Sequence, residues 1–413
     1  MSGTALVFGN GRSGKAAAEL LRREGMEVAV LDGEDAFPSG GFSLAVTSPG
    51  VPLSHPWQVR ARELGIPVIS ELQLGAERFR ARGGKMLAVT GSKGKSSVVK
   101  VVSDGINLAG GKAVPCGNYG KPLCEVVNEL RDGEEPPWAV VEVSSFQMET
   151  TTLPSDAFEA AAILNLQEDH LDRHGSAETY HALKRRLLAM AKQKFDFSDV
   201  GPGDAGRVAR PARPRARGTR APTLSTEDCF KFPGSYFYND VLAPNGVVAA
   251  LLMDCAGLSK RDIGRAFREF EPLPHRMQLV AEMDGVRYID DSKATSIAAL
   301  VAGVEMAGVG VRLVAGGLPK GDNPKIAISV LSRSVKKVYL IGASADQFYD
   351  SWKEAVECEK CGTVQEAVKR AKRDAQRGET VLLSPGTASF DQFKSYGERG
   401  DVFAASVKEG RER

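Results

Sequence analysis

The chain has 413 residues, and 54 Lys and Arg nearly balance 52 Asp and Glu to leave a formal net charge of +2. Because a domain usually has roughly 100 to 200 residues, this length predicts two or three domains. The balanced charge provides no overall field for nucleic acid, although basic residues can still cluster locally, so we expect no nucleic-acid partner. Six cysteines are too sparse for a disulfide scaffold and indicate a reducing compartment.

The N-terminal residues lead directly into a strand and a glycine turn, without the basic and apolar regions of a signal peptide. No apolar run approaches the roughly 18 residues needed to span a bilayer. We therefore expect a cytoplasmic protein with no membrane span. The sequence does not determine the oligomeric state, for which a monomer is our working expectation.

The first predicted unit opens as β-α-β. Thr4–Phe8 has the pattern of a buried strand, Gly9–Gly14 of a turn, Lys15–Arg23 of a helix and Met26–Leu31 of a second strand. Two shorter strands are expected at Leu44–Thr47 and Ile66–Ile69. The unit is complete by about residue 83.

A second unit opens with a strand at Lys85–Thr90, a glycine loop and a helix from Lys95, and it continues with strands at Trp138–Val143 and Ala161–Leu166. A third begins near Leu273, with strands expected at Arg287–Asp290, Val311–Ala315, Lys337–Ile341 and Thr380–Leu383. Such alternation predicts parallel sheets. The predicted α/β fold thus has three domains, a Rossmann-like domain at 1–83, a central P-loop domain at 84–272 and a Rossmann-like domain at 273–413.

The segment Gly201–Pro222 is rich in Pro, Gly and Arg and lacks the apolar periodicity of a packed element. It is predicted to be loop or disorder. A basic arm that touches nucleic acid or lipid is the alternative, and we assign the segment no function.

The most informative motif is the loop Thr90–Ser97, TGSKGKSS, between a predicted strand and a predicted helix. It is a shortened P-loop, because Val89 stands where the full pattern has its first glycine. Backbone N–H groups at a helix start can hold phosphates, Lys95 can neutralise their oxygens, and a hydroxyl of Ser96 or Ser97 can reach Mg²⁺. The loop therefore predicts nucleotide binding.

The turn Gly9–Gly14 and Asp32, eighteen residues beyond its last glycine, also match the dinucleotide fingerprint. Alone, this pattern would suggest a nicotinamide dehydrogenase. Because the unit is short for a full dinucleotide domain, a mononucleotide such as a uridine diphosphate or a purely structural turn is at least as plausible.

Two polar residues follow apolar strands of the second unit. Glu142 ends the run VVEV, and His170 lies among Glu168, Asp169 and Asp172. Ligand crevices form at the carboxyl ends of parallel strands, so both are candidates to hold Mg²⁺. The alternatives are a structural carboxylate for Glu142 and a surface ion pair for His170.

The third unit carries four strings at the expected strand ends, namely LPHR, DDSKATS, GGLPKGD and LLSPGTASFDQF. Their small residues let a backbone approach a ligand, while Lys293 and Lys320 can bind carboxylate or phosphate. Each lysine can equally be a solvated surface residue. The Cys358–Cys361 pair lacks the second half of a zinc site, so we expect ordinary thiols at a helix or turn.

Together, TGSKGKSS, SSFQMET, ILNLQEDHLDRH, LPHR, DSKAT and LLSPGTASFDQF resemble the Mur ligases, and within them the D-glutamate-adding (MurD) type, over nearly the whole chain. The resemblance implies ATP-dependent addition of D-glutamate to UDP-N-acetylmuramoyl-L-alanine through an acyl phosphate, in peptidoglycan synthesis. It further implies two Mg²⁺ ions and a carbamylated lysine at Lys184, for which an exposed helix lysine is the plain alternative.

The resemblance assigns roles residue by residue. Catalysis is implied for Lys95, Glu142, His170, Lys184 and Arg276. Metal binding is implied for Ser96, Glu142, His170 and Lys184. ATP would contact Gly91, Ser92, Lys93, Gly94, Lys95, Ser96, Ser97, Asn245, Arg276, Asp291 and Lys293. The UDP substrate would contact Ser13, Asp32, Ser48, Gly50 and Asn118. D-Glutamate would contact Thr295, Lys320, Ser389 and Tyr396.

Three positions depart from the family pattern. Val241 and Leu242 replace a His-Asn pair before Asn245, and Tyr396 replaces a phenylalanine. The segment 201–222 replaces a strand and an acidic turn. The alternatives are therefore another Mur or folylpolyglutamate-type ligase, a catalytically weakened nucleotide-binding homologue, and a nicotinamide oxidoreductase. The sequence does not say whether the first peptide residue is L-alanine, glycine or L-serine.

Overall fold

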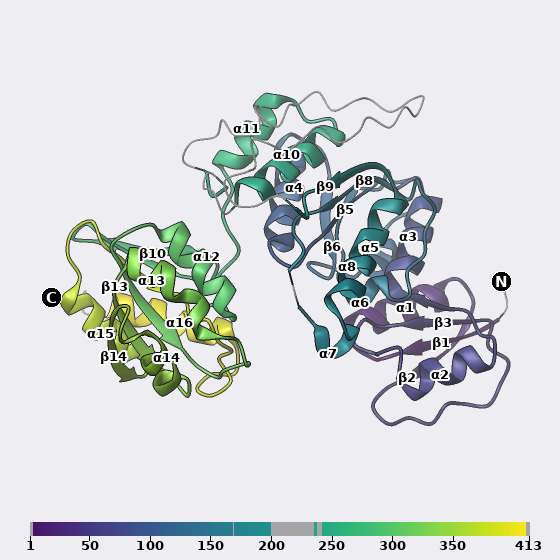
Figure 1. The fold of residues 1–413 in the computed structure, drawn as a ribbon. Coiled ribbons are helices and arrows are strands. Elements are labelled where there is room, and N and C mark those ends of the chain that lie inside the picture. Colours follow the sequence, from purple (N-terminus) through teal and green to yellow (C-terminus); the bar gives the residue numbers. More distant parts are fainter. Residues whose placement is uncertain (1–2, 168, 200–234, 238–241, 410–413) are drawn as a thin grey trace. The chain divides into compact units, whose positions relative to one another are not determined.

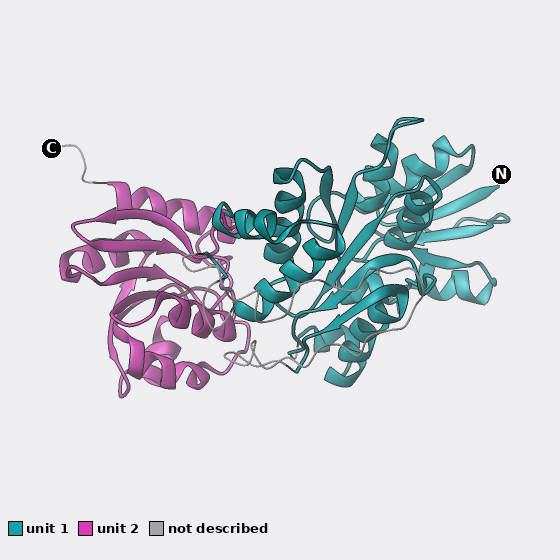
Figure 2. Ribbon diagram, turned by 90° about the horizontal axis from the view of Figure 1, so that it is seen from above, with its two compact units in different colours: residues 1–270 teal, residues 271–413 magenta. Residues whose placement is uncertain are grey.

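The computed structural model describes residues 3–167, 169–199, 235–237 and 242–409 (Figure 1). The chain divides into two compact units, Met1–Phe270 and Glu271–Arg413 (Figure 2). Within the described part, no helix is long and apolar enough to cross a membrane. The predicted loop at 201–222, Val241 and Glu168 lie outside the described residues.

Four parallel strands form the first sheet, in the order β2-β1-β3-β4. The strands are β1 (Thr4–Phe8), β2 (Glu27–Leu31), β3 (Leu44–Thr47) and β4 (Val68–Ser70), and the helices are α1 (Arg12–Arg23), α2 (Pro56–Glu63) and α3 (Glu71–Ala81). All four strands were predicted to within two residues at either end. A Cβ at Gly14 would lie 1.8 Å from the Gly9 carbonyl oxygen, so only glycine lets α1 start this close to β1.

The second sheet has five parallel strands in the order β6-β7-β5-β8-β9. The strands are β5 (Met86–Thr90), β6 (Ala113–Gly117), β7 (Trp138–Glu142), β8 (Phe158–Ile163) and β9 (Ala191–Asp196). The helices are α4 (Lys95–Leu108), α5 (Leu123–Glu129), α6 (Ser145–Met148), α7 (Leu171–His174), α8 (Ala177–Arg185), the 3₁₀ helix η1 (Arg186–Met190), α10 (Ala243–Cys255) and α11 (Lys260–Arg268). Strand β8 starts and ends three residues earlier than predicted, and β6 and β9 were not predicted.

The central strand β5 is apolar throughout because both of its faces are covered. Met86 and Ala88 pack in one cluster with residues of α1, α3 and α5, while Leu87 and Val89 pack in another with α4, α10 and α11. Since α1 and α3 of the first sheet pack on α5 of the second, the two sheets share a core. That shared core explains why the first two predicted domains form one compact unit here.

The second unit contains a six-stranded sheet in the order β10-β11-β15-β12-β13-β14, in which only β10 is antiparallel. The strands are β10 (Gln278–Met283), β11 (Val286–Asp290), β12 (Val311–Gly316), β13 (Val335–Ile341), β14 (Glu357–Gly362) and β15 (Thr380–Leu383). The helices are α12 (Ile297–Ala307), the 3₁₀ helix η3 (Pro324–Ala327), α13 (Ile328–Ser334), α14 (Ala345–Trp352), α15 (Val364–Asp374) and α16 (Tyr396–Lys408). Apolar clusters cover both faces of the sheet.

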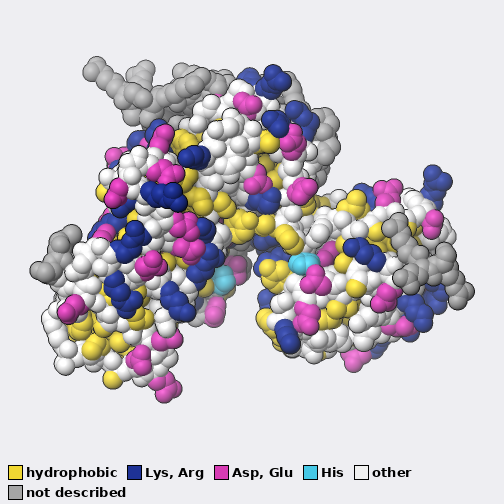
Figure 3. All heavy atoms as spheres, turned by 180° about the vertical axis from the view of Figure 1, so that it is seen from behind, with side chains coloured by type: hydrophobic (Ala, Val, Ile, Leu, Met, Phe, Trp, Pro, Cys, Tyr) yellow, Lys and Arg dark blue, Asp and Glu magenta, His cyan; other side chains and the backbone are white. Residues whose placement is uncertain are grey.

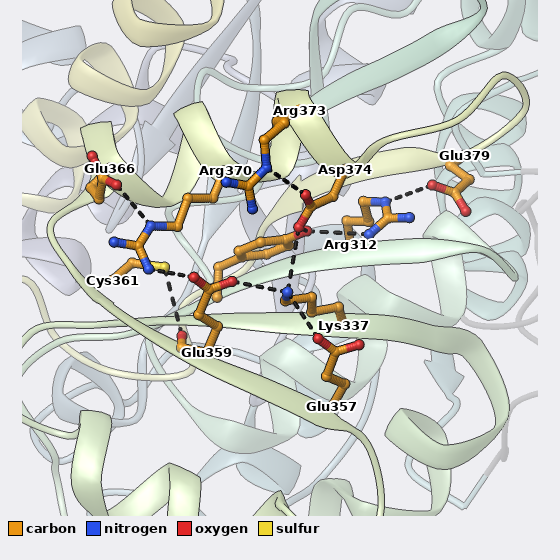
Figure 4. A network of polar contacts seen from close by, with 11 residues as sticks. Arg312, Lys337, Glu357, Glu359, Cys361, Glu366, Arg370, Arg373, Asp374 and Glu379 are labelled. Carbon is orange, nitrogen blue, oxygen red and sulfur yellow. Dashed lines mark hydrogen bonds and ion pairs between the residues drawn. The ribbon is translucent and has the colours of Figure 1, made fainter.

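An ion-pair network joins the starts of β12, β13 and β14 to the end of α15 (Figure 4). The Lys337 ammonium lies 2.9 Å from Glu357 and from Glu359 and 3.4 Å from Asp374. Burial lowers the pKa of Lys337, but the hydrogen bonds and charges of Glu357 and Glu359 together outweigh it and raise that pKa above its usual value. The network therefore links these elements at the end of the sheet that is opposite to the carboxyl ends of its parallel strands.

The thiols of Cys358 and Cys361 were expected on a helix or turn, and this was wrong. Both lie in β14, a polar edge strand in which the network pairs Glu357 and Glu359 with cations. Cys358 packs on one face of the sheet and Cys361 against the cluster on the other. Side chains on opposite faces cannot bind one metal ion or form a disulfide with each other.

Charges of both signs are mixed on the face of the molecule drawn in Figure 3. On the face drawn in Figure 3, Lys and Arg side chains are interspersed with Asp and Glu. The pattern matches the balanced composition, since neither sign forms a continuous field across that face.

Candidate active site

The loop between β5 and α4 has the backbone geometry of a phosphate-binding turn. Gly91 and Gly94 have φ values of +150° and +85°, which glycine adopts without strain. Gly94 is the N-cap residue of α4, so the first N–H groups of that helix are directed out of the loop, where an anion can accept from them. The Lys93 N–H donates to Asn165 Oδ1 (2.9 Å), which fixes the loop against the segment after β8.

Two of the predicted nucleotide residues, Lys95 and Asn245, contact this loop. The Lys95 ammonium bends back over it and donates to the carbonyls of Gly91 (2.8 Å) and Ser92 (3.1 Å). Asn245, at the start of α10, lies against it so closely that a Cβ at Gly94 would be 2.3 Å from its side-chain nitrogen. Ser96 is partly buried in the first turn of α4, and Ser97 is buried.

Lys184 of α8 is a buried lysine, with 1% of its surface exposed. Its ammonium donates to the Gly91 carbonyl (2.9 Å), the same oxygen that accepts from Lys95, and to Thr90 Oγ1 (3.4 Å). Burial, with the Lys95 ammonium as the second cause, lowers the pKa of Lys184 to about 7. An exposed helix lysine, the plain alternative, is therefore wrong, and a large fraction of this amine is neutral near pH 7.

Glu142 ends β7 beside β5 and is 2% exposed. Its Oε1 accepts from the Asn118 amide at 2.7 Å, which draws this predicted UDP-substrate residue to the carboxylate. Its Oε2 is buried, and no described residue hydrogen-bonds to it. A buried carboxylate oxygen without a partner is costly, so a cation at this oxygen would supply the missing interaction.

His170 lies on the more open side of the same group of residues, with 47% of its side chain exposed. Its backbone is left-handed (φ +52°), and its ring contacts Phe146 (centroids 4.8 Å apart) and Tyr180 (6.3 Å). The Tyr180 hydroxyl lies 3.1 Å from Ser92 Oγ in the loop, and the Lys184 ammonium lies over the Tyr180 ring. The loop, Lys184 and His170 thus surround one tyrosine.

The donor atoms fit Mg²⁺ better than a transition metal. Among the described residues, no three His, Cys, Asp or Glu side chains lie together as a metal site. Glu142 offers an oxygen without a partner, Ser96 is a hydroxyl in the first turn of α4, and a carbamate at Lys184 would add further oxygens. Oxygen ligands are what Mg²⁺ prefers, and it retains waters where the protein supplies few ligands.

The predicted UDP-substrate residues of the first sheet gather at its carboxyl edge. Ser13 is in the first turn of α1, and Asp32 Oδ1 accepts from the Asn10 N–H (3.3 Å) in the preceding glycine turn. Ser48 Oγ donates to the Gly9 carbonyl (3.4 Å), and Gly50 is exposed in the same turn. Asn118 belongs to the second sheet, so this predicted set spans both sheets of the first unit.

In the second unit, backbone hydrogen bonds bring together the predicted nucleotide residues of LPHR and DDSKATS. The Lys293 N–H donates to the His275 carbonyl (3.0 Å), next to Arg276. Asp291 is directed inward, where it accepts from Ser384 Oγ (3.0 Å) and the Met277 N–H (3.3 Å). Burial raises its pKa to about 7. In this structure Asp291 therefore fixes the Arg276 turn and is not presented to solvent.

Three of the predicted amino-acid residues lie in loops after β11, β12 and β15, and the fourth, Tyr396, is the first residue of α16. Hydrogen bonds join these segments to one another. Leu318, two residues before Lys320, exchanges backbone hydrogen bonds with Ala388, next to Ser389. The loop of Thr295 is joined to that of Lys320, because the Ile297 N–H donates to Asp322 Oδ2 (3.0 Å). The Tyr396 carbonyl accepts from Ser292 Oγ (2.7 Å), and the Lys293 ammonium lies 3.8 Å from the Tyr396 ring centroid.

Arg399 of α16, which the sequence reasoning missed, holds these loops together. It is 0% exposed, and within the described part of the chain its hydrogen bonds go to neutral oxygens. Nε donates to Ser292 Oγ (3.0 Å), Nη2 to the carbonyls of Ser292 (3.0 Å) and Thr387 (3.1 Å), and Nη1 to those of Ala388 (3.1 Å) and Gly316 (3.5 Å). The one sequence signal was its place on the inward face of α16 with Phe403 and Val407.

Replacing Arg399 by methionine is expected to destabilise the protein. Methionine fills similar space but leaves several buried carbonyls unsatisfied, which would cost about 3 kcal/mol or more of the free energy of unfolding. Chemical denaturation followed by circular dichroism measures this loss. Arg333→Met is the matched control, since Arg333 pairs only loosely with Glu305 at the surface and should change little. Equal stability of the two variants would contradict the role given to Arg399.

Two family models match the chain, the Mur ligase middle domain at residues 89–197 and the Mur ligase, glutamate ligase domain at residues 275–386. Among curated relatives, proteins named UDP-N-acetylmuramoylalanine--D-glutamate ligase are similar over nearly their full length. The one from Acidobacterium capsulatum is 34% identical, with 96% of this chain and 94% of the relative covered. The one from Aquifex aeolicus is 33% identical, with 98% of each chain covered.

Solved structures show the same fold at low sequence identity. The UDP-N-acetylmuramate-alanine ligase MurC of Thermotoga maritima matches with a TM-score of 0.53 and 15% identity over 98% of both chains. MurF of Acinetobacter baumannii matches with a TM-score of 0.54 and 15% identity over 82% of this chain and 80% of that one. With relatives above 30% identity over almost the whole length, the chain belongs to the Mur ligase family.

Proposed function

We propose that this protein is the ATP-dependent ligase that joins D-glutamate to UDP-N-acetylmuramoyl-L-alanine. The nearly full-length similarity to relatives named UDP-N-acetylmuramoylalanine--D-glutamate ligase supports these substrates. The observation that supports the chemistry best is the meeting of two buried side chains at one glycine loop, the ammonium of Lys184 at the Gly91 carbonyl and the carboxylate of Glu142 on the neighbouring strand. A nicotinamide oxidoreductase is not supported, since the chain belongs to a family of ligases.

The reaction has two steps. In the first, the alanyl carboxylate attacks the γ-phosphorus of ATP and ADP leaves, which forms an acyl phosphate. In the second, the D-glutamate amine attacks the acyl carbon, loses a proton and expels inorganic phosphate, which leaves an amide. Bound Mg²⁺ would neutralise phosphate charge in the first step.

The residues of the first unit have distinct proposed tasks in phosphoryl transfer. The N–H groups in the first turn of α4 would hold the phosphates, and the Lys95 ammonium would move from its loop carbonyls to the γ-phosphate as charge shifts onto the departing ADP. Glu142, through a carboxylate oxygen, and His170, through a ring nitrogen, would each hold one of two Mg²⁺ ions, and Ser96 and a carbamylated Lys184 would add oxygen ligands. Asn245 lies against the loop and would fix the nucleotide beside it.

The low pKa of Lys184 supports carbamylation. Only a neutral amine attacks CO₂, and an ordinary lysine is almost fully protonated at pH 7, whereas burial brings the pKa of Lys184 to about 7. The resulting carbamate would carry a negative charge into a pocket where the Lys95 ammonium already lies. Carbamylation therefore places an anion beside that cation, which is a favourable interaction.

The remaining proposed contacts follow the predicted domains at 1–83, 84–272 and 273–413. Ser13, Asp32, Ser48, Gly50 and Asn118 would hold the UDP substrate. Arg276, Asp291 and Lys293 of the second unit would complete nucleotide binding, Asp291 through the turn that it fixes. Thr295, Lys320, Ser389 and the backbone at Tyr396 would hold D-glutamate.

Phosphate release from ATP tests the assignment. With UDP-N-acetylmuramoyl-L-alanine present, D-glutamate should stimulate release strongly, whereas L-glutamate and D-alanine should not. Equal stimulation by all three would refute the amino-acid assignment. No stimulation by any of them, in protein that still binds ATP, would favour the catalytically weakened homologue.

A further inference from the structure

Arg173 of α7 joins three segments of the first unit that are distant in sequence. Its Nε and Nη2 donate to the two carboxylate oxygens of Glu149, at 3.0 and 2.6 Å. The same Nη2 donates to the Val51 carbonyl (3.3 Å), in the turn that carries Ser48 and Gly50. The guanidinium lies over the Phe146 ring, 4.5 Å from its centroid.

The bridge is largely shielded from solvent, because 14% of the Arg173 side chain and 7% of the Glu149 side chain are exposed. Surface ion pairs are weak because water and salt screen them and because two mobile side chains must be ordered. A two-pronged pair stacked on an aromatic ring is held in one geometry. It can therefore transmit a displacement from one segment to the other.

His174, the next residue of α7, strengthens the attachment of α7 to α6. Its Nε2 lies 3.0 Å from Ser145 Oγ, and its Nδ1 lies 3.5 Å from Glu149 Oε1. The helix α7 has only four residues and no buried ones, so these side-chain contacts, rather than a core of its own, determine its position.

The N-cap residue of α7 is His170, whose left-handed backbone is unfavourable for a non-glycine residue. Its ring packs on Phe146, the ring that also stacks with Arg173. A shift of α7 would consequently move His170. Arg173 thus connects the turn of the predicted UDP-substrate site to a predicted metal residue.

We propose that Arg173 is a positioning residue that couples binding of the UDP substrate at the 48–51 turn to binding of Mg²⁺ and nucleotide at the His170 side of the loop. This inference rests on the proposed function, since it uses that function's substrates. A UDP substrate that orders the 48–51 turn would hold α7, and with it His170, in the geometry that the metal-nucleotide complex needs. Coupling is reciprocal, so each ligand should raise the affinity for the other.

Isothermal titration of UDP-N-acetylmuramoyl-L-alanine, with and without Mg²⁺ and a non-hydrolysable ATP analogue, tests this coupling. In the unaltered protein the analogue should lower the Kd of the UDP substrate by about fivefold or more, the lower end of typical coupling. In Arg173→Met, which keeps an apolar stem over Phe146, that factor should fall to near one. Arg173→Lys should also lose most of it, since one ammonium cannot reproduce the two-pronged pair and the contact with Val51.

Arg80→Met is the matched control. Arg80 of α3 pairs with Asp156 (2.9 Å), which lies two residues before the start of β8. The glycine loop follows the opposite, carboxyl end of the parallel neighbour β5, so loss of Arg80 should leave the coupling factor unchanged. Titrations are made under conditions in which circular dichroism shows that every variant is folded. Full coupling in Arg173→Met, or none in the unaltered protein that binds both ligands, would overturn the inference. Failure of the unaltered protein to bind the UDP substrate at all would instead refute the proposed function.

Discussion

Lys95→Ala is expected to lower kcat by about 100- to 1,000-fold, the loss typical when one group that stabilises transition-state charge is removed. In the structure the Lys95 ammonium donates hydrogen bonds to two carbonyls of the loop itself, those of Gly91 and Ser92. It is therefore close to where a γ-phosphate would lie and needs only a local movement to reach it. The expected defect is catalytic rather than structural, because these hydrogen bonds are local.

Phosphate release at saturating substrates measures this effect, and thermal unfolding checks that the variant is folded. Lys112→Ala is the control, since Lys112 is largely exposed and only loosely paired with Glu134. A folded Lys95→Ala protein with the full rate would remove the loop from the mechanism.

Lys184→Ala is expected to lower kcat by about 100-fold or more, since the variant would lack the proposed carbamate, a charged ligand worth several kcal/mol in the transition state. The unaltered enzyme should lose activity in buffer freed of CO₂ and regain it when bicarbonate is added. The variant should respond to neither treatment. A response to CO₂ in the unaltered enzyme but not in the variant would distinguish a carbamate at Lys184 from a lysine that only supports the loop.

The same lysine predicts a direction for pH dependence. Its folded-state pKa of about 7 lies below that of an ordinary lysine, so the neutral amine predominates above pH 7 and is lost as the pH falls through 7. Carbamylation and activity should fall together on the acidic side. Activity that is constant from pH 8 to pH 6, at fixed dissolved CO₂, would be inconsistent with a carbamate at Lys184.

The strands that the sequence predicted well are those whose surroundings are apolar. β1, β3 and β15 match the expected residues because each is a short apolar run that ends at a glycine or polar turn. β6, β9, β10 and β14 were missed, and all four are edge strands. An edge strand has one side open to solvent, so charged residues such as those of β14 are tolerated and hide the strand pattern.

The candidate site likewise contains residues that the sequence predicts and residues that it does not. The loop at 91–97 could be predicted because the residues that give it its phosphate-binding chemistry are consecutive in the sequence. Arg399 could not, since its role depends on carbonyls from loops that lie 11 to 107 residues away along the chain. The merging of the first two predicted domains into one unit also depended on long-range packing, that of α1 and α3 on α5.

Transfer of ¹⁸O tests the central claim most directly. UDP-N-acetylmuramoyl-L-alanine labelled with ¹⁸O in its alanyl carboxylate is incubated with ATP, Mg²⁺, D-glutamate and the protein, and the released phosphate is analysed by mass spectrometry. An acyl phosphate carries one carboxylate oxygen to phosphorus, so each phosphate formed with the amide product should contain one ¹⁸O. Amide product accompanied by unlabelled phosphate would contradict activation of the carboxylate by direct phosphorylation.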